Sequence, residues 1–127
     1  MLPTPPLDPE SAPFYEAAKD GRFLIRRCTR CKEPHWYPRS LCPFCFSPTD
    51  WEEASGRGTL MSYSSVPSGD DPYVLAFVQL EEGPAMLTNI VDCPPERLVV
   101  GMDVAVSWVD AGSEKAPCFT PTAHDRN

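Results

Sequence analysis

Residues 28–45 contain two short cysteine motifs, Cys28-Thr29-Arg30-Cys31 and, after ten further residues, Cys42-Pro43-Phe44-Cys45. Each Cys-x-x-Cys pair brings two sulfur atoms together in one tight turn, and the connection is long enough for the two turns to face each other. Four thiolates at this spacing suit one tetrahedral ion. The pattern predicts a zinc ribbon in which Cys28, Cys31, Cys42 and Cys45 hold a structural Zn²⁺. An iron site of the rubredoxin kind and two disulfides are the alternatives.

The residues that follow each cysteine pair affect the shape of the two turns. The position after the second cysteine often needs a positive φ and is often glycine. Here it is occupied by Lys32 and Phe46, so we expect turns that are strained or differently shaped. His35 lies between the pairs, but four sulfur atoms already complete a tetrahedron, and we do not expect it to be a ligand.

The segments on either side of the first pair complete the predicted ribbon. Residues 22–27 contain the apolar run Phe23-Leu24-Ile25 and predict its first strand, and residues 33–39 return the chain toward the second pair. We expect Trp36 and Tyr37 to cover a metal site that is too small to have a core of its own. A partner or ligand surface is the other interpretation of these two aromatic residues.

The first 21 residues predict an extended arm followed by a helix. Residues 1–10 include four prolines and no apolar periodicity. Residues 11–21 predict a helix of about three turns, with Ser11 as N-cap and Gly21 as C-cap. Such a short helix is not stable alone in water. Its apolar face must therefore dock on the ribbon or on another subunit.

The chain after the ribbon predicts five strands. They cover residues 59–66, 73–81, 85–91, 102–109 and about 116–120, with a short irregular or helical link at 93–98. A short element between the third and fourth strands is typical of an OB-fold, although an SH3-like barrel has similar spacing. We therefore predict a mostly β protein with four parts: 1–21 arm and helix, 22–50 zinc ribbon, 51–122 OB-fold, and 123–127 disordered tail.

Composition and charge narrow the function classes. No apolar stretch is long enough to span a membrane and the N-terminus does not resemble a signal peptide, so we expect a soluble cytoplasmic protein with reduced thiols. The net charge is −7, yet seven of the 11 Lys and Arg residues lie between residues 19 and 39. With Asp20 and Glu33 this segment carries +5, which leaves −12 on the rest. A general nucleic-acid binder is therefore not expected.

The basic segment is the main candidate for binding. Arginine binds phosphate oxygens in a bidentate manner, so such a segment suits a phosphorylated ligand such as coenzyme A, or an acidic protein surface. Contacts to CoA or to a partner are predicted for Arg26, Arg27, Arg30, Lys32 and Arg39. The plain alternative is a solvated face whose long side chains cover the ribbon.

Catalytic residues are not evident in the sequence. His35 and His124 have no obvious acid–base partner. Cys93 and Cys118 each lie beside proline with no nearby cation to lower the thiol pKa, so we expect inert thiols. Asp70 and Asp71 form a solvated turn or, less plausibly, a weak cation site. We expect a chain that is not catalytic alone.

Motifs spread over residues 11–121 resemble a family of acyl-CoA-associated proteins, long labelled a domain of unknown function. The matching motifs are Phe14-Tyr15-Glu16-Ala17, Gly21-Arg22-Phe23-Leu24, the two cysteine pairs with Trp36-Tyr37-Pro38-Arg39, Gly56-Arg57-Gly58-Thr59, and Glu82-Gly83-Pro84 before Leu87-Thr88-Asn89. The missing glycine after Cys31 departs from a common form. The resemblance implies an N-terminal helix, a rubredoxin-like zinc ribbon and an OB-fold.

The resemblance also implies a function. Such proteins bind thiolase-like enzymes, or enoyl-CoA hydratases of the MaoC type, and act in steroid side-chain degradation, in thiolysis of aromatic acyl-CoAs and in acyl transfer. The catalytic residues then belong to the partner. We therefore predict an auxiliary subunit of a thiolase-like aldolase or thiolase, in a hetero-oligomer such as a heterotetramer, that helps accommodate the acyl-CoA substrate.

Three other functions remain open from the sequence. The partner could be a MaoC-type hydratase instead of a thiolase-like enzyme. An OB-fold could bind single-stranded nucleic acid with Tyr63, Tyr73 and Phe77 as stacking platforms. An iron-loaded ribbon could transfer electrons.

Overall fold

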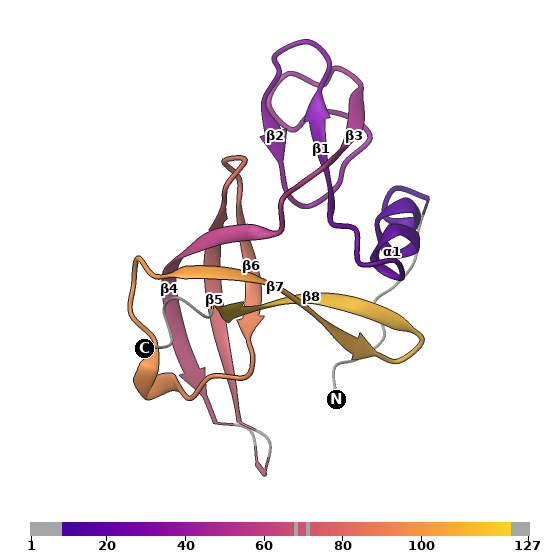
Figure 1. Cartoon of the computed structure of the whole chain (residues 1–127). Helices are drawn as coiled ribbons and strands as arrows, with labels where there is room; N and C mark the ends of the chain where they lie inside the picture. The colour runs from indigo at the N-terminus through magenta and orange to yellow at the C-terminus, as the bar shows by residue number, and fades with distance from the viewer. Residues whose placement is uncertain (1–8, 68, 71, 123–127) are drawn as a thin grey trace.

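A short helix, a three-stranded ribbon and a five-stranded barrel follow one another along the chain in the computed structural model (Figure 1). The structure describes residues 9–67, 69–70 and 72–122. The mostly β fold and the order of its parts agree with the prediction. The predicted disordered tail, most of the predicted arm, and Asp71 lie outside the described residues.

Helix α1, Ala12–Ala18, is shorter than predicted. Ser11 occupies the N-cap position as predicted, and its carbonyl accepts hydrogen bonds from the amides of Phe14 and Tyr15, although its side chain makes no capping hydrogen bond. Gly21 ends the helix as predicted. Its φ is 75°, and its amide and that of Arg22 donate to carbonyls of the last turn. The apolar face contacts β1 and β8, so α1 docks within this chain.

The ribbon consists of β1, Leu24–Cys28, β2, Pro34–His35, and β3, Thr49–Glu53. The strands are antiparallel in the order β2-β1-β3, and the register pairs Leu24 with Glu53 and Cys28 with Thr49. Strand β3 therefore crosses the predicted boundary between residues 50 and 51. The first cysteine turn follows the end of β1 that points away from the barrel (Figure 1).

The barrel consists of β4, Arg57–Val66, β5, Tyr73–Leu80, β6, Ala85–Ile90, β7, Asp103–Ala111, and β8, Glu114–Pro121. It closes in the order β4-β5-β6-β8-β7. The β6–β8 pair is parallel and the others are antiparallel. The short 3₁₀ helix η1, Pro95–Arg97, lies between β6 and β7 as the link predicted there.

The interior of the barrel is apolar. Alternate residues of β5 point inward, and the fully buried side chains of Leu60, Val78, Val104 and Phe119 meet there. Burying each such side chain stabilises the fold by about 1.5–3 kcal/mol. The barrel therefore has a core that does not depend on a ligand.

Aromatic side chains join the helix, the ribbon and the barrel. The Phe14 ring of α1 lies 5.8 Å from Phe23, 5.0 Å from Trp36 and 6.0 Å from Trp108, measured between ring centroids. Trp36 was predicted to cover the metal site, and the structure instead places it in this junction. One continuous core cluster therefore runs from α1 through the ribbon base into the barrel.

No helix among the described residues is long and apolar enough to cross a membrane.

Candidate metal centre

The four ribbon cysteines converge on one point. The Sγ atoms of Cys28, Cys31, Cys42 and Cys45 all lie within 4.8 Å of one another. Across the two turns, Cys28 Sγ is 3.5 Å from Cys45 Sγ, and Cys31 Sγ is 3.7 Å from Cys42 Sγ. The structure thus assembles the predicted ligand set from two turns that are ten residues apart in sequence.

Backbone amides orient the two sulfur atoms that begin each turn. The amides of Arg30 and Cys31 each donate to Cys28 Sγ at 3.3 Å, and the amide of Phe44 donates to Cys42 Sγ at the same distance. Such hydrogen bonds favour the thiolate over the thiol, because they offer positive partial charge to the sulfur. Against the opposing effect of burial, they lower the pKa of Cys28. The pKa of Cys31 is instead raised to about 12, because a lowering backbone hydrogen bond at Glu33 is outweighed by desolvation of the sulfur and by its hydrogen bonds with the other three ribbon cysteines.

The residues after each pair adopt the backbone conformation that the motif requires. Lys32 has φ of 66° and Phe46 has φ of 64°, the left-handed region that glycine occupies most readily. The absence of glycine therefore does not change the shape of the turns. Its consequence is local backbone strain, which costs of order 1 kcal/mol at each position.

The cluster fits a tetrahedral metal ion. An ion with metal–sulfur distances of about 2.3 Å holds its sulfur ligands about 3.8 Å apart, close to the distances across the two turns. All six cysteines are free thiols, which disagrees with the disulfide alternative. Hydrogen bonds from the side chain and backbone of Ser47 lower the pKa of Cys45 to about 6.

His35 lies beside the cluster without joining it. The grouped ligand atoms come from cysteines alone. The imidazole is buried, and this burial lowers its pKa. Neither ring nitrogen has a hydrogen-bond partner among the described residues. His35 is therefore a neutral side chain of the ribbon interior at physiological pH.

Two of the five predicted CoA or partner contacts are engaged inside the ribbon. The Arg26 guanidinium lies 4.2 Å from the centre of the Trp51 ring and donates to the Thr49 carbonyl. Arg27 binds the Glu52 carboxylate through two nitrogen atoms, at 2.9 and 3.0 Å. The basic charge of β1 is thus largely neutralised by β3.

The other three predicted contacts are exposed near the cysteine turns. Arg30, Lys32 and Arg39 all face solvent, and Lys32 donates to the Thr29 carbonyl at 2.8 Å. The cationic surface that could reach a phosphate is therefore smaller than the sequence suggested.

Residues with catalytic potential are not brought together. Cys118 is buried, and this burial raises the pKa of its thiol to about 11. Cys93 Sγ donates to the Pro94 carbonyl. His35 is the one histidine among the described residues, and Asp70 is exposed in a turn. In the part of the chain that the structure describes, Ser55 Oγ donates to Glu81 Oε2 at 2.9 Å at an exposed site, and no histidine or cysteine takes part in that pair.

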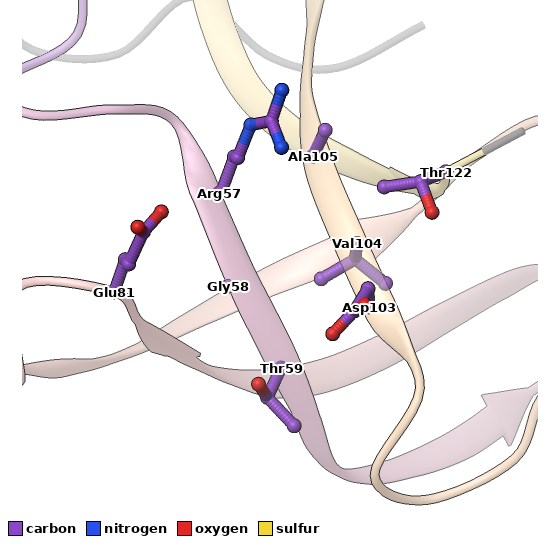
Figure 2. Close-up of a pocket in the computed structure, with 8 residues that line it drawn as sticks. All are labelled: Arg57, Gly58, Thr59, Glu81, Asp103, Val104, Ala105 and Thr122. Carbon is purple, nitrogen blue, oxygen red and sulfur yellow. The ribbon is translucent and has the colours of Figure 1, made fainter. Parts of the chain in front are cut away.

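The β4–β7 pair borders a pocket of about 520 Å³ at one end of the barrel. In Figure 2 the Arg57 side chain extends beside Ala105, while Thr59 and Asp103 lie together further along the pair. Glu81 lies on the other side of β4. The lining residues include charges of both signs, and the described ones include neither histidine nor cysteine.

The residues proposed to stack nucleic-acid bases do not form one platform. Tyr73 and Phe77 occupy the outer face of β5, whereas Tyr63 donates its hydroxyl proton to the Leu98 carbonyl. Register places no Lys or Arg beside the two outer aromatics. Single-strand binding normally needs cations that follow the backbone, so this arrangement disfavours it.

The sequence interpretation missed an exposed apolar surface on β5 and β6. Leu75, Phe77 and Leu87 are among the exposed large apolar residues. The signal was present in the sequence, because β5 reads Tyr-Val-Leu-Ala-Phe-Val-Gln-Leu and is apolar at both alternating positions. A strand with one solvated face normally alternates apolar with polar residues.

Two family models together match residues 16–109. The rubredoxin-like zinc ribbon domain of ChsH2 matches residues 16–52, and the C-terminal OB-fold domain of ChsH2 matches residues 51–109. A chain of the solved Ltp2-ChsH2(DUF35) aldolase is 36% identical, with a TM-score of 0.80 over 92% of this chain and 98% of that chain. These matches confirm the predicted zinc ribbon and OB-fold.

Three curated relatives share parts of their length with this chain. A probable enoyl-CoA hydratase alpha subunit from Thermomonospora curvata is 38% identical over 95% of this chain and 40% of that protein. A DUF35 domain-containing scaffold protein from Methanocaldococcus jannaschii is 40% identical over 61% of each chain. The 3-oxo-4,17-pregnadiene-20-carboxyl-CoA hydratase alpha subunit from Mycobacterium tuberculosis is 30% identical over 80% of this chain and 34% of that protein. The chain therefore spans between about a third and three fifths of these relatives.

Proposed function

This chain belongs to the ChsH2 (DUF35) family of zinc-ribbon and OB-fold proteins, and on that premise we propose that it is an auxiliary subunit of an acyl-CoA enzyme. It binds a thiolase-like retro-aldolase or thiolase, completes the complex and helps accommodate the CoA-linked substrate. One observation carries the proposal: this chain covers 98% of a chain of the Ltp2-ChsH2(DUF35) aldolase at 36% identity.

The described residues support an auxiliary role. The buried thiol of Cys118 has a raised pKa and is therefore a poor nucleophile. The buried imidazole of His35 has a lowered pKa and is therefore a poor base, and it lies in the ribbon whereas Cys118 lies in the barrel. An enzyme that cleaves or forms carbon–carbon bonds next to a CoA thioester needs a positioned nucleophile or base. In this proposal the partner supplies those groups.

The metal has a structural role in the proposal. Cys28, Cys31, Cys42 and Cys45 would hold Zn²⁺, and four protein ligands leave no open position for water or substrate. The ion would contribute folding free energy to the ribbon. One equivalent of zinc in a colourless protein supports this assignment, and a coloured iron protein contradicts it.

Complex formation tests the proposed function. The tagged chain is co-expressed separately with each thiolase-like and each MaoC-like protein of its source organism, and the purified products are weighed by native mass spectrometry. We expect a stable hetero-oligomer, such as a heterotetramer, with one thiolase-like protein. A chain that remains a lone monomer with every candidate would contradict the proposal.

The exposed cations are proposed to meet the phosphates of CoA or an acidic surface of the partner. Arg30 and Arg39 are the better candidates of the predicted set, since Arg26 and Arg27 are engaged with β3. Reversing both charges in Arg30→Glu/Arg39→Glu should raise the KM of the complex for acyl-CoA several-fold. The matched control is Arg97→Glu, an exposed arginine of η1 outside the predicted set. Equal KM values in the wild type and the double variant would remove these residues from the proposal.

A MaoC-type hydratase is the second candidate partner. The similarity to two hydratase alpha subunits favours this partner. The name of one of them describes a hydratase of a steroid-derived acyl-CoA. The same co-expression experiment separates the two partners, because only one class should co-purify. A steroid acyl-CoA is the proposed substrate class for either complex.

A further inference from the structure

We propose that the uncharged outer face of β4–β6, together with the groove that continues it to the zinc ribbon, is the surface on which the acyl-CoA enzyme subunit docks. The inference rests on the proposed function, which supplies the partner. It adds the place of contact and the chemistry that the partner presents there: apolar anchors and a cationic side chain.

The outer face is defined by strand register. Residues opposite each other in antiparallel strands share a face, so the pairs Ser62–Phe77, Ser64–Leu75 and Phe77–Leu87 lie on one side of the sheet. The face consists of Thr59, Ser62, Ser64, Val66, Tyr73, Leu75, Phe77, Gln79, Ala85, Leu87 and Asn89. None of these eleven residues is charged, in a chain of which 23% is charged. Arg57, the first residue of β4, borders the face on the same side of the sheet. A contiguous apolar patch of this kind marks an interaction surface.

A groove extends this face to the ribbon. It has a volume of about 390 Å³ and is bordered by Pro34, Trp36 and Phe44 of the ribbon and by Pro84 and Ala85 at the start of β6. Ala85 belongs to both the groove and the outer face. In Figure 1 the β5–β6 turn projects toward β2 of the ribbon. The two parts therefore form one surface that spans both modules.

The groove is acidic. Glu33 and Glu82 line it, and none of its described lining residues is Lys or Arg. The Glu82 Oε2 atom accepts a hydrogen bond from the Ser55 amide at 2.8 Å, whereas its Oε1 atom is buried with no hydrogen-bond partner among the described residues. Leaving a buried carboxylate oxygen unpaired is costly. A cationic side chain inserted by the partner would satisfy it.

This charge pattern selects one occupant. Nucleic acid and the phosphates of CoA require several cations, whereas the described residues of the outer face and the groove include none and Arg57 alone borders the face. A second copy of the chain would meet this surface with the same surface across a two-fold axis. That contact would bring acidic grooves to a face without cations and leave Glu82 Oε1 unpaired. A different protein with aliphatic or aromatic anchors and one Arg or Lys fits both parts.

The first test places a charge on the outer face. Leu87 is 52% exposed, so Leu87→Asp should fold normally, and Val100→Asp is the control because Val100 is 61% exposed outside this face. Affinity for the co-purifying partner is measured by titration calorimetry, with circular dichroism as the fold check. Truncating or charging a central interface residue costs at least about 30-fold in affinity. We expect that loss for Leu87→Asp and an affinity within about twofold of wild type for Val100→Asp.

The second test addresses the groove. Glu82→Gln keeps the acceptor for the Ser55 amide and removes the charge. We expect about tenfold weaker binding and a smaller dependence of affinity on salt, since a charge pair is lost. Should Leu87→Asp fail to fold, hydrogen–deuterium exchange on the wild-type complex replaces it, with protection expected in 73–80 and 85–90.

The outcomes separate the two proposals. If the wild-type chain binds no acyl-CoA enzyme subunit, the proposed function fails. If it binds one and Leu87→Asp and Glu82→Gln bind as tightly, only the docking surface is overturned. If Leu87→Asp abolishes self-association while the hetero-complex keeps its affinity, the face joins two copies of this chain, which also overturns the inference.

Discussion

The ribbon strands β1–β3 contain 5, 2 and 5 residues, whereas the five barrel strands contain between 6 and 10. Buried positions differ in kind as well as in number. In the ribbon they include Cys28, Cys42, His35 and Thr49, and in the barrel they are mostly aliphatic or aromatic.

The difference shows two ways of stabilising a small β-structure in one chain. The barrel buries enough apolar surface to offset the entropy of ordering its strands. The remote end of the ribbon cannot do so and depends on four sulfur atoms that a cation holds together. Phe14 and Trp36 then fix the ribbon base to the barrel core.

Replacing a ribbon cysteine should affect the ribbon far more than the barrel. Cys42→Ser removes one of the four metal ligands. In small zinc domains, the binding of structural Zn²⁺ contributes on the order of 10 kcal/mol to the free energy of folding. We expect loss of the ion and collapse of amide dispersion for residues 28–49, with residues 57–121 still dispersed in a ¹H–¹⁵N correlation spectrum. Cys93→Ser is the matched control and should retain one equivalent of zinc. If the amide signals of residues 28–49 stay dispersed after the ion is lost, the ribbon does not depend on the ion and the contrast between ribbon and barrel is wrong.

Substitution of Phe14, where the helix, the ribbon and the barrel meet, should have the next largest effect on the free energy of unfolding. Phe14 is fully buried and contacts aromatic rings of both modules. Phe14→Ala should lower the free energy of unfolding by about 3–5 kcal/mol, because a large buried side chain is lost and a cavity remains. Urea unfolding measures this. The control Phe46→Ala, at an exposed ribbon position, should change it by less than about 0.5 kcal/mol. Equal effects at the two positions would mean that α1 does not join the modules.

The ion pairs at the β1–β3 side of the ribbon should contribute little to the free energy of unfolding. Arg27 and Glu52 form a two-point contact with both side chains about a third exposed, whereas Arg22 and Glu53 are more than half exposed. Double-mutant cycles to alanine should give a coupling of about 0.5–1 kcal/mol for the first pair and less for the second, both weakened by salt. A larger coupling at Arg22–Glu53 would reverse the expected order.

Replacing His35 should change the free energy of unfolding least of all, and only in a defined pH range. Its pKa is lowered from 6.5 by burial, so the unfolded chain binds the proton more tightly than the folded chain. The stability it contributes is present above about pH 6.5 and is lost as the pH falls toward the folded-state pKa. Unfolding in excess zinc between pH 7.5 and 5.5 should therefore show a steeper decline for wild type than for His35→Phe. Parallel curves would mean that His35 titrates normally.

Local patterns predicted most of the fold. The cysteine spacing predicted the metal centre, because short-range geometry alone decides which sulfur atoms meet. The alternation and turn residues predicted five strands, and Gly21 predicted the end of α1. These features depend on neighbours in sequence, so one sequence was sufficient.

Features that depend on contacts between segments distant in the sequence could not be predicted from local patterns. Arg26 and Arg27 were predicted to contact CoA or a partner, and nothing in the local sequence showed that β3 would place Trp51 and Glu52 beside them. Trp36 was assigned to the metal site and packs on Phe14 instead. The groove between the ribbon and β6 arises from residues about 50 positions apart, and no local pattern indicates it.

The central claim is that this chain completes another subunit's active site and has none of its own. The most direct measurement is the rate of acyl-CoA turnover by the purified chain, by the co-purifying partner, and by the reconstituted complex, each with zinc-loaded protein. The account predicts no turnover by the chain alone and a complex whose kcat/KM exceeds that of the partner at least tenfold. Turnover of an acyl-CoA by the isolated chain, or a partner equally active without it, would contradict the account.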